Sequence, residues 1–127
     1  MTAWELRQQQ QVLCAILHVE ITTFAWSMGF RDLIIPGPRP IGITGQPFDM
    51  ARNTACHALL NSSCQYLFFL DSDVVPPADA VLRLLAHNQH IVSGTYCRRS
   101  PPIAVPVMQK NGGWCTVPPN NGVIEVD

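Results

Sequence analysis

The stretch YLFFLDSD, residues 66–73, decides which fold the sequence predicts. Its first five residues are aromatic or aliphatic without alternation, which is typical of a central strand covered on both faces of a parallel sheet. Asp71 and Asp73 follow at the carboxyl end of that strand. In open sheets with helices on both faces, ligands bind outside the carboxyl ends of the strands. We therefore predict a strand that delivers two carboxylates to a ligand-binding edge.

Strand and helix patterns alternate along the rest of the chain. Further apolar runs predict strands at 12–17, 41–44, 91–96, 104–109 and 123–126. Helix patterns lie at 22–33, from Gln46-Pro47 to residue 60, and from Pro76-Pro77 onward. Residues 1–11 are predicted to be an N-terminal extension or to hold a short helix at 2–10. This order predicts one α/β domain over 1–127, a Rossmann-like three-layer α/β/α fold with a mainly parallel sheet.

Each predicted helix carries an apolar stripe that indicates which side faces the sheet. We expect Phe24, Met28 and Leu33 to share one side of the first helix. The second and third stripes comprise Ala51, Ala55, Ala58 and Leu59, and Ala78, Val81, Leu82 and Leu85.

Composition excludes several classes of function. A net charge of -1 gives no electrostatic footprint for nucleic acid or anionic lipid. The apolar run at 12–17 is far shorter than the roughly 20 residues that span a bilayer, so we expect no membrane span and take the cytoplasm as the default location. The five cysteines are odd in number and lack metal-ligand spacing, which favours reduced, buried thiols.

The Asp71-Ser72-Asp73 triplet has two readings from its chemistry alone. If the two carboxylates converge, their charges repel unless a cation lies between them, and Mg²⁺ or Mn²⁺ completes its oxygen shell with substrate phosphates. Alternatively, the aspartates only end the strand and cap the following turn. Both readings remain open at this point.

Two motifs together resemble a known family. The sequence ARNTA at 51–55, followed by YLFFLDSD, is similar to the signature of family 2-type glycosyltransferases with the A-type nucleotide-diphospho-sugar fold, over about residues 12–110. The resemblance implies a nucleotide-diphospho-sugar donor with Mn²⁺ or Mg²⁺, Asp73 bound to the metal, and Asp71 at the ribose or the metal. Ser72 and Arg52 would lie beside the nucleotide.

The resemblance also implies that His18 to Glu20 border the base. Relatives often end the first strand in Pro-Thr, whereas this chain has Leu17-His18, which leaves the choice of base undecided. Arg98 and Arg99 follow the predicted fourth strand and either neutralise phosphate, which guanidinium groups suit, or form a solvated turn before Pro101-Pro102. Arg52 has an alternative as a surface partner of Asp49.

Family members continue into a segment that carries the catalytic base and the acceptor site. Glu125 and Asp127 are the only acidic residues after Asp79. Asp127 could serve as that base, against which stands the usual mobility of a terminal residue, and the chain is expected to be a fragment or a minimal form. Two other functions remain open. One is a non-catalytic nucleotide-sugar-binding module. The other is a phosphohydrolase of the haloacid dehalogenase type, in which Asp71 would be the nucleophile and Asp73 the acid/base.

The short chain and its charged fraction of only 13% predict a homodimer, because so few charges indicate surface that a partner covers. The alternative is an ordinary surface rich in Pro, Asn, Gln and Ser. Light scattering at high protein concentration should give twice the mass of one chain, and a monomer there would contradict the prediction.

Overall fold

The computed structural model describes residues 11–94 and 107–116. The chain divides into two compact units, Met1–His90 and Ile91–Asp127. The first unit holds an α/β arrangement, and the second holds a two-stranded hairpin.

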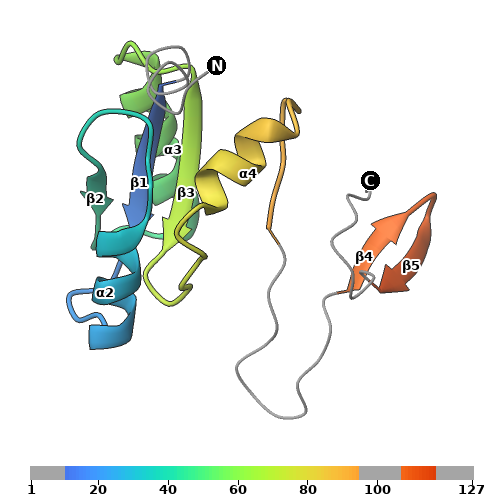
Figure 1. Cartoon of the computed structure of the whole chain (residues 1–127), viewed down its shortest axis with the longest axis horizontal. Helices are drawn as coiled ribbons and strands as arrows, with labels where there is room; N and C mark the ends of the chain where they lie inside the picture. The colour runs from blue at the N-terminus through green and yellow to red at the C-terminus, as the bar shows by residue number, and fades with distance from the viewer. Residues whose placement is uncertain (1–10, 95–106, 117–127) are drawn as a thin grey trace. The chain divides into compact units, whose positions relative to one another are not determined.

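The sheet of the first unit has three parallel strands in the order β2-β1-β3 (Figure 1). They are β1 (Val12–Leu17), β2 (Ile41–Ile43) and β3 (Tyr66–Asp71), which confirms three predicted strands. The prediction of a central position for the 66–70 strand is wrong for this sheet. Among the described residues β3 pairs with β1 alone, and β1 is the strand with a neighbour on each side.

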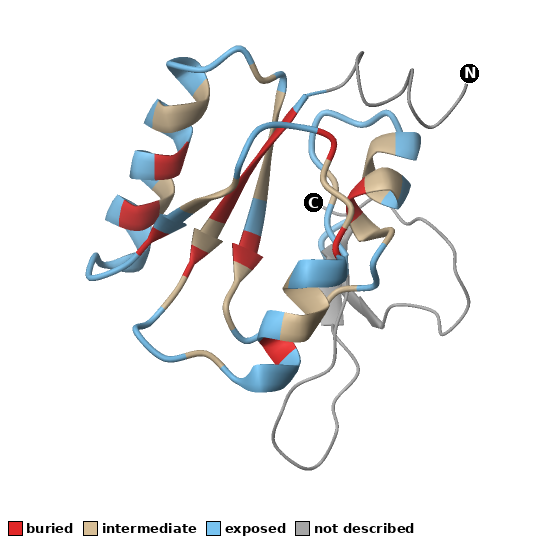
Figure 2. Cartoon of the chain, turned by 60° about the vertical axis from the view of Figure 1, so that its left-hand side comes forward, coloured by how far each residue is buried: buried red, intermediate tan, exposed pale blue. Residues whose placement is uncertain are grey.

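Helices cover both faces of this sheet because β1 buries alternate residues on opposite sides. Val12 and Cys14 pack in one cluster with residues of α2 (Phe24–Asp32) and α4 (Ala80–Ala86). Ala15 and Leu17 pack in a second cluster with α3 (Phe48–Leu60). Figure 2 shows the buried positions along the strands and on the helix surfaces turned towards them. The α/β class is thus confirmed, and the arrangement is compatible with a Rossmann-like fold.

The buried side of α2 differs from the prediction. Thr23 caps the helix, with its hydroxyl accepting a hydrogen bond from the Trp26 backbone N–H at 3.1 Å. Trp26 is buried and stacks on Phe30 with ring centroids 5.3 Å apart, whereas Phe24 is 80% exposed. Trp26 and Phe30 lie one helical turn apart and so share one side of α2, and this is the side that faces the sheet.

The other two helices follow their predicted stripes more closely. Ala51 and Ala55 of α3 are buried, as expected. Val81 anchors α4, but the helix begins later than predicted and Ala78 is exposed. The Ala78 carbonyl accepts a hydrogen bond from the Ile34 N–H at 2.9 Å, so it is engaged outside the helix. None of the described helices is long and apolar enough to cross a bilayer.

The second unit departs most from the sequence prediction. Ile91–Gly94, the described part of the predicted fourth strand, forms no strand. Strand β4 (Val107–Lys110) overlaps the predicted 104–109 strand and pairs antiparallel with β5 (Gly113–Thr116), which was not predicted. Asn111 and Gly112, with φ of 53° and 73°, form the tight turn that suits a two-residue hairpin loop. The predicted helix at 2–10 and strand at 123–126 lie outside the described residues.

Burial of a thiol on the central strand β1 makes the free energy of unfolding depend on pH. Burial raises the pKa of the Cys14 thiol from 9.0 to about 12. The unfolded chain loses this proton near pH 9 and the folded chain retains it, so the free energy of unfolding falls as the pH rises from about 9 towards 12. In urea titrations, Cys14→Ala should lessen this fall by roughly 1 kcal/mol per pH unit. Cys56→Ala, which removes an exposed thiol, is the control, and equal slopes in all three proteins would contradict the prediction.

Candidate functional site

The carboxyl ends of β1 and β3 form the edge that carries the candidate site. The chain leaves β1 to build β2 on one side and later adds β3 on the other, so the connections diverge at the β1–β3 boundary. Such a switch point is where open α/β sheets bind ligands. Pairing continues past the strands, since the Ser72 N–H donates to the Leu17 carbonyl at 3.1 Å and the His18 N–H donates to the Ile43 carbonyl at 3.0 Å.

Asp71 and Asp73 lie at this edge, as the sequence predicts. Asp71 is the last residue of β3, with a side chain 36% exposed, and Asp73 is exposed in the turn that follows. The Asp71 carbonyl accepts hydrogen bonds from the Val74 N–H at 3.2 Å and from the Trp26 indole N–H at 3.2 Å. The turn that displays both carboxylates is therefore attached to α2 as well as to β3.

Arg52 of α3 lies beside Asp71. One guanidinium nitrogen is 3.9 Å from a carboxylate oxygen of Asp71, and the guanidinium lies over the rings of Phe48 and Phe69 at 5.6 Å and 5.7 Å. Of the carboxylates that the structure describes, Asp71 rather than Asp49 is within ion-pair distance of Arg52. With both side chains about 40% exposed, the pair contributes at most about 1 kcal/mol to stability. The contact therefore matters for where it places the Arg52 guanidinium rather than for the stability of the fold.

A pocket of about 290 Å³ lies at the same edge, between the β1–α2 connection, α2 and β2. His18 and Glu20, predicted to border a base, both line it, and so does Trp26. The His18 ring is placed by an Nδ1 hydrogen bond with the Val19 carbonyl at 2.8 Å. Its Nε2 lies so near Gly42 that a Cβ there would come within 2.9 Å. Trp26 thus contributes to the pocket wall and also holds the Asp71 carbonyl.

Potential metal ligands do not form a larger group with Asp71 and Asp73 in the described part of the chain. Within 11–94 and 107–116, no set of three or more His, Cys, Asp or Glu side chains could enclose a metal ion. Ser72 is half-buried beside the aspartates. Arg98, Arg99 and Asp127 lie outside the described residues, so their predicted roles remain predictions. A metal held here by Asp71 and Asp73 would need further oxygen ligands from a bound substrate or from water.

Three aromatic residues of this site are not predicted from the sequence. Trp26 was not assigned a role, and neither Phe48 nor Phe69 was connected with Arg52. The available signals were short-range: Phe48 precedes Arg52 by one helical turn, and Phe69 precedes Asp71 by two residues and so lies on the same face of β3. Which of these faces meet in space depends on the packing of α3 against the sheet.

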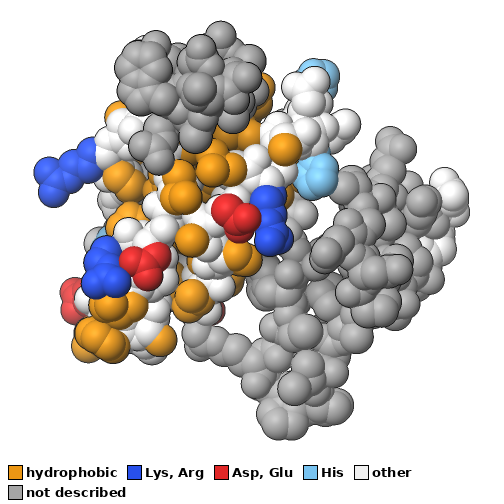
Figure 3. Space-filling model, viewed as in Figure 1, with side chains coloured by type: hydrophobic (Ala, Val, Ile, Leu, Met, Phe, Trp, Pro, Cys, Tyr) orange, Lys and Arg blue, Asp and Glu red, His pale blue; other side chains and the backbone are white. Residues whose placement is uncertain are grey.

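Exposed apolar side chains lie on the segments that follow or end the three strands at this edge. They belong to the β1–α2 connection, the two helix starts, the end of β3 and the turn after it: Val19, Ile21, Phe24, Phe48, Met50, Phe69 and Val75. Figure 3 shows hydrophobic side chains between scattered charged ones on one face of the molecule.

Comparisons of the chain with protein-family models, with curated proteins and with solved structures each found no match. The likeness to glycosyltransferases therefore depends on the sequence of residues 51–55 and 66–73 alone.

Removal of the Trp26 indole N–H should loosen the turn after β3. Trp26→Phe keeps an aromatic ring against Phe30 but deletes the donor to the Asp71 carbonyl, so we expect a loss of about 1–2 kcal/mol in the free energy of unfolding by urea. Phe24→Leu on the same helix changes an exposed ring and should stay within about 0.5 kcal/mol of wild type. Equal losses in the two variants would show that the indole has no special part.

Proposed function

We propose that this chain is the donor-binding part of a metal-dependent glycosyltransferase, which transfers a sugar from a nucleotide-diphospho-sugar to an acceptor hydroxyl. The observation that carries the proposal is the position of Asp71 and Asp73 at the carboxyl end of β3, beside the β1–β3 switch point. A nucleotide-binding function is what this place in an open parallel sheet supports best.

The donor set at this edge fits Mg²⁺ or Mn²⁺. Both ions are hard cations that prefer oxygen ligands, and Mg²⁺ sites often use only one or two carboxylates together with substrate phosphates. Asp71 and Asp73 are accessible from solvent, and no third His, Cys, Asp or Glu of the described chain joins them. That shortage of protein ligands suits a metal that arrives with a diphosphate.

Other features of the edge suit the rest of the donor. Helices α2 and α3 both begin after a strand ends there, so their positive N-terminal ends lie on the side where a diphosphate would bind. Arg52 adds a guanidinium beside Asp71. The pocket lined by His18, Glu20 and Trp26 offers apolar walls and two polar side chains for a base.

The proposed reaction needs negative charge to be stabilised on the leaving diphosphate. A bound divalent ion supplies that stabilisation as a Lewis acid. The chain's own contribution is to position the donor: Asp71 and Asp73 hold the metal end, Arg52 compensates phosphate charge, and the pocket orients the base. The acceptor's proton would be removed by a carboxylate, for which Asp127 remains the predicted candidate.

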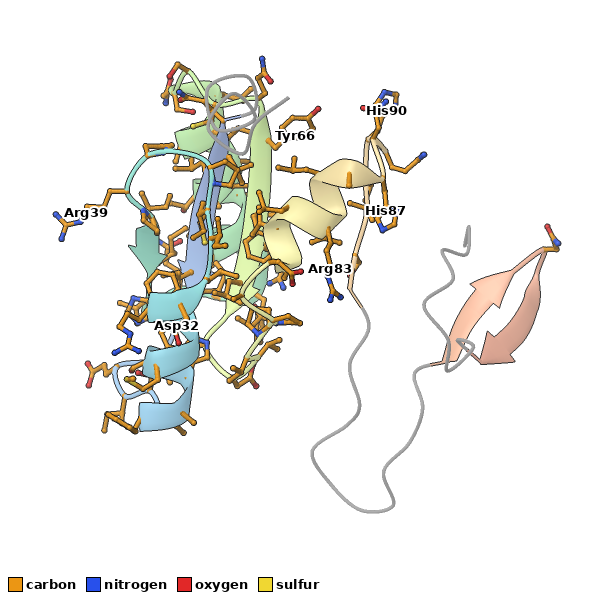
Figure 4. The ribbon with its side chains drawn as sticks, in the orientation of Figure 1. Asp32, Arg39, Tyr66, Arg83, His87 and His90 are labelled. Carbon is orange, nitrogen blue, oxygen red and sulfur yellow. The ribbon has the colours of Figure 1, made fainter. Side chains whose placement is uncertain are left out.

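Metal-dependent binding of a donor tests the proposal. A screen of UDP-, GDP-, CMP- and dTDP-sugars should find one that raises the melting temperature with Mn²⁺ and not without it, and calorimetry should then give its affinity. Asp73→Ala should abolish that binding and keep its melting temperature within about 2 °C of wild type, because exposed turn carboxylates contribute little to the core. Asp32→Ala is the matched control, since Asp32 is an exposed, ion-paired aspartate on the last turn of α2 (Figure 4).

The alternatives give different results in the same assays. Unchanged donor affinity in Asp73→Ala would refute the proposal. Metal-dependent binding without any release of nucleoside diphosphate would identify a binding module rather than an enzyme. A melting shift with Mg²⁺ and fluoroaluminate, but with none of the sugar nucleotides, would favour the phosphohydrolase.

A further inference from the structure

Arg52 is held at the edge of the site by groups from two different elements. Phe48 lies on the same helix, while Phe69 and Asp71 belong to β3. The other ion pairs in the described part of the chain, Arg31–Asp32 and Arg83–Asp79, join residues one and four positions apart on one element. The Arg52 contact instead links α3 to the residue that begins the Asp-x-Asp motif.

The aromatic contacts fix a guanidinium that solvent would otherwise leave mobile. A guanidinium within about 6 Å of an aromatic centroid is attracted by the ring, at about 0.5–1 kcal/mol for each exposed contact. Arg52 makes two such contacts, at 5.6 Å and 5.7 Å. Its flat group stacks on rings in a way that a lysine ammonium does not. The positive charge is therefore kept near Asp71 without a hydrogen bond to it.

The distance to Asp71 leaves the N–H groups of Arg52 available. At 3.9 Å the carboxylate compensates the charge of Arg52 but is too far to accept a hydrogen bond. No hydrogen bond of the Arg52 side chain to another described residue is present either. A second anion at this edge could accept bonds from the guanidinium while the two rings keep it in place, and a phosphate suits its planar donors.

From this arrangement we infer that Arg52 couples the two ligands of the site, weakening the binding of a divalent ion alone and strengthening the binding of a diphosphate with that ion. The inference depends on the proposed function, because it assigns a role at the same metal and diphosphate site. Without ligands, Arg52 is the cation beside Asp71. A divalent ion that binds alone meets its positive charge, and a diphosphate that binds with the ion neutralises both.

Removal of the charge should therefore change the two affinities in opposite directions. Arg52→Gln should bind Mn²⁺ alone about threefold to tenfold tighter, because a unit charge and a divalent ion a few ångströms apart repel even in a high dielectric. With saturating Mn²⁺, the same variant should bind inorganic pyrophosphate at least tenfold more weakly. Paramagnetic resonance of free Mn²⁺ gives the first affinity and calorimetry the second, and pyrophosphate avoids any choice of base.

Arg52→Lys separates charge from shape. It keeps the positive charge, so its affinity for Mn²⁺ alone should stay within about twofold of wild type, while its affinity for pyrophosphate should fall between those of wild type and Arg52→Gln. Phe48→Leu should weaken pyrophosphate binding modestly, because it removes one of the two rings. Phe24→Leu, which changes a similarly exposed ring on α2, the helix that packs on the opposite face of the sheet from α3, is its control.

The outcomes distinguish this inference from the proposed function. If wild type binds no pyrophosphate with Mn²⁺, both are overturned. If wild type binds both ligands and Arg52→Gln weakens Mn²⁺ binding or leaves it unchanged, the coupling role is overturned and the proposed function stands. If Arg52→Gln does not fold, Arg52→Lys decides the matter, since a lysine that changes Mn²⁺ affinity more than pyrophosphate affinity contradicts the role of charge.

Discussion

The parallel pairing of β1 with β3 is the constraint on which the candidate site depends. It runs in register over six residue pairs and places Leu17 opposite Asp71. Because side chains alternate along a strand, a slip of one residue would move Asp71 and Phe69 to the opposite face, away from α3 and Arg52. The hydrogen bonds from Ser72 to Leu17 and from Trp26 to the Asp71 carbonyl fix the same register from outside the strand. The position of the aspartates thus follows from backbone pairing, with one tryptophan as support.

Small residues at the middle of the sheet bring the helix that carries Arg52 close to that edge. Ala15 of β1 and Ala55 of α3 are fully buried, and Ala51 is nearly so. Alanines on both surfaces let the helix approach the strands closely, and the helix phase that buries Ala51 brings the next residue, Arg52, to the border of the contact. Packing of an apolar stripe therefore positions a charged group, which connects the core to the site.

The sequence predicts the helices and strands of this protein better than it predicts which of them pack against one another. Continuous apolar runs gave β1 and β3, and the stripe from Ala51 gave α3, because these signals are local. Three features depend instead on which surfaces pack together, and a single run of residues does not encode such packing. They are the central place of β1, the burial of Trp26 in preference to Phe24, and the β5 strand. The Asp-x-Asp motif was found because its chemistry is local, whereas the Phe48–Arg52–Phe69 arrangement needed the contact between α3 and β3.

In the proposed function, the charges at the edge favour the joint binding of a metal and a diphosphate. Two carboxylates and one guanidinium leave an excess of negative charge, which disfavours a diphosphate on its own. A divalent ion reverses that sign but is opposed by the nearby guanidinium. A diphosphate that binds together with the ion offsets this positive charge, so each ligand compensates the charge that the other brings. A pair of aspartates without Arg52 would bind the metal more readily but would lose this dependence of one ligand on the other.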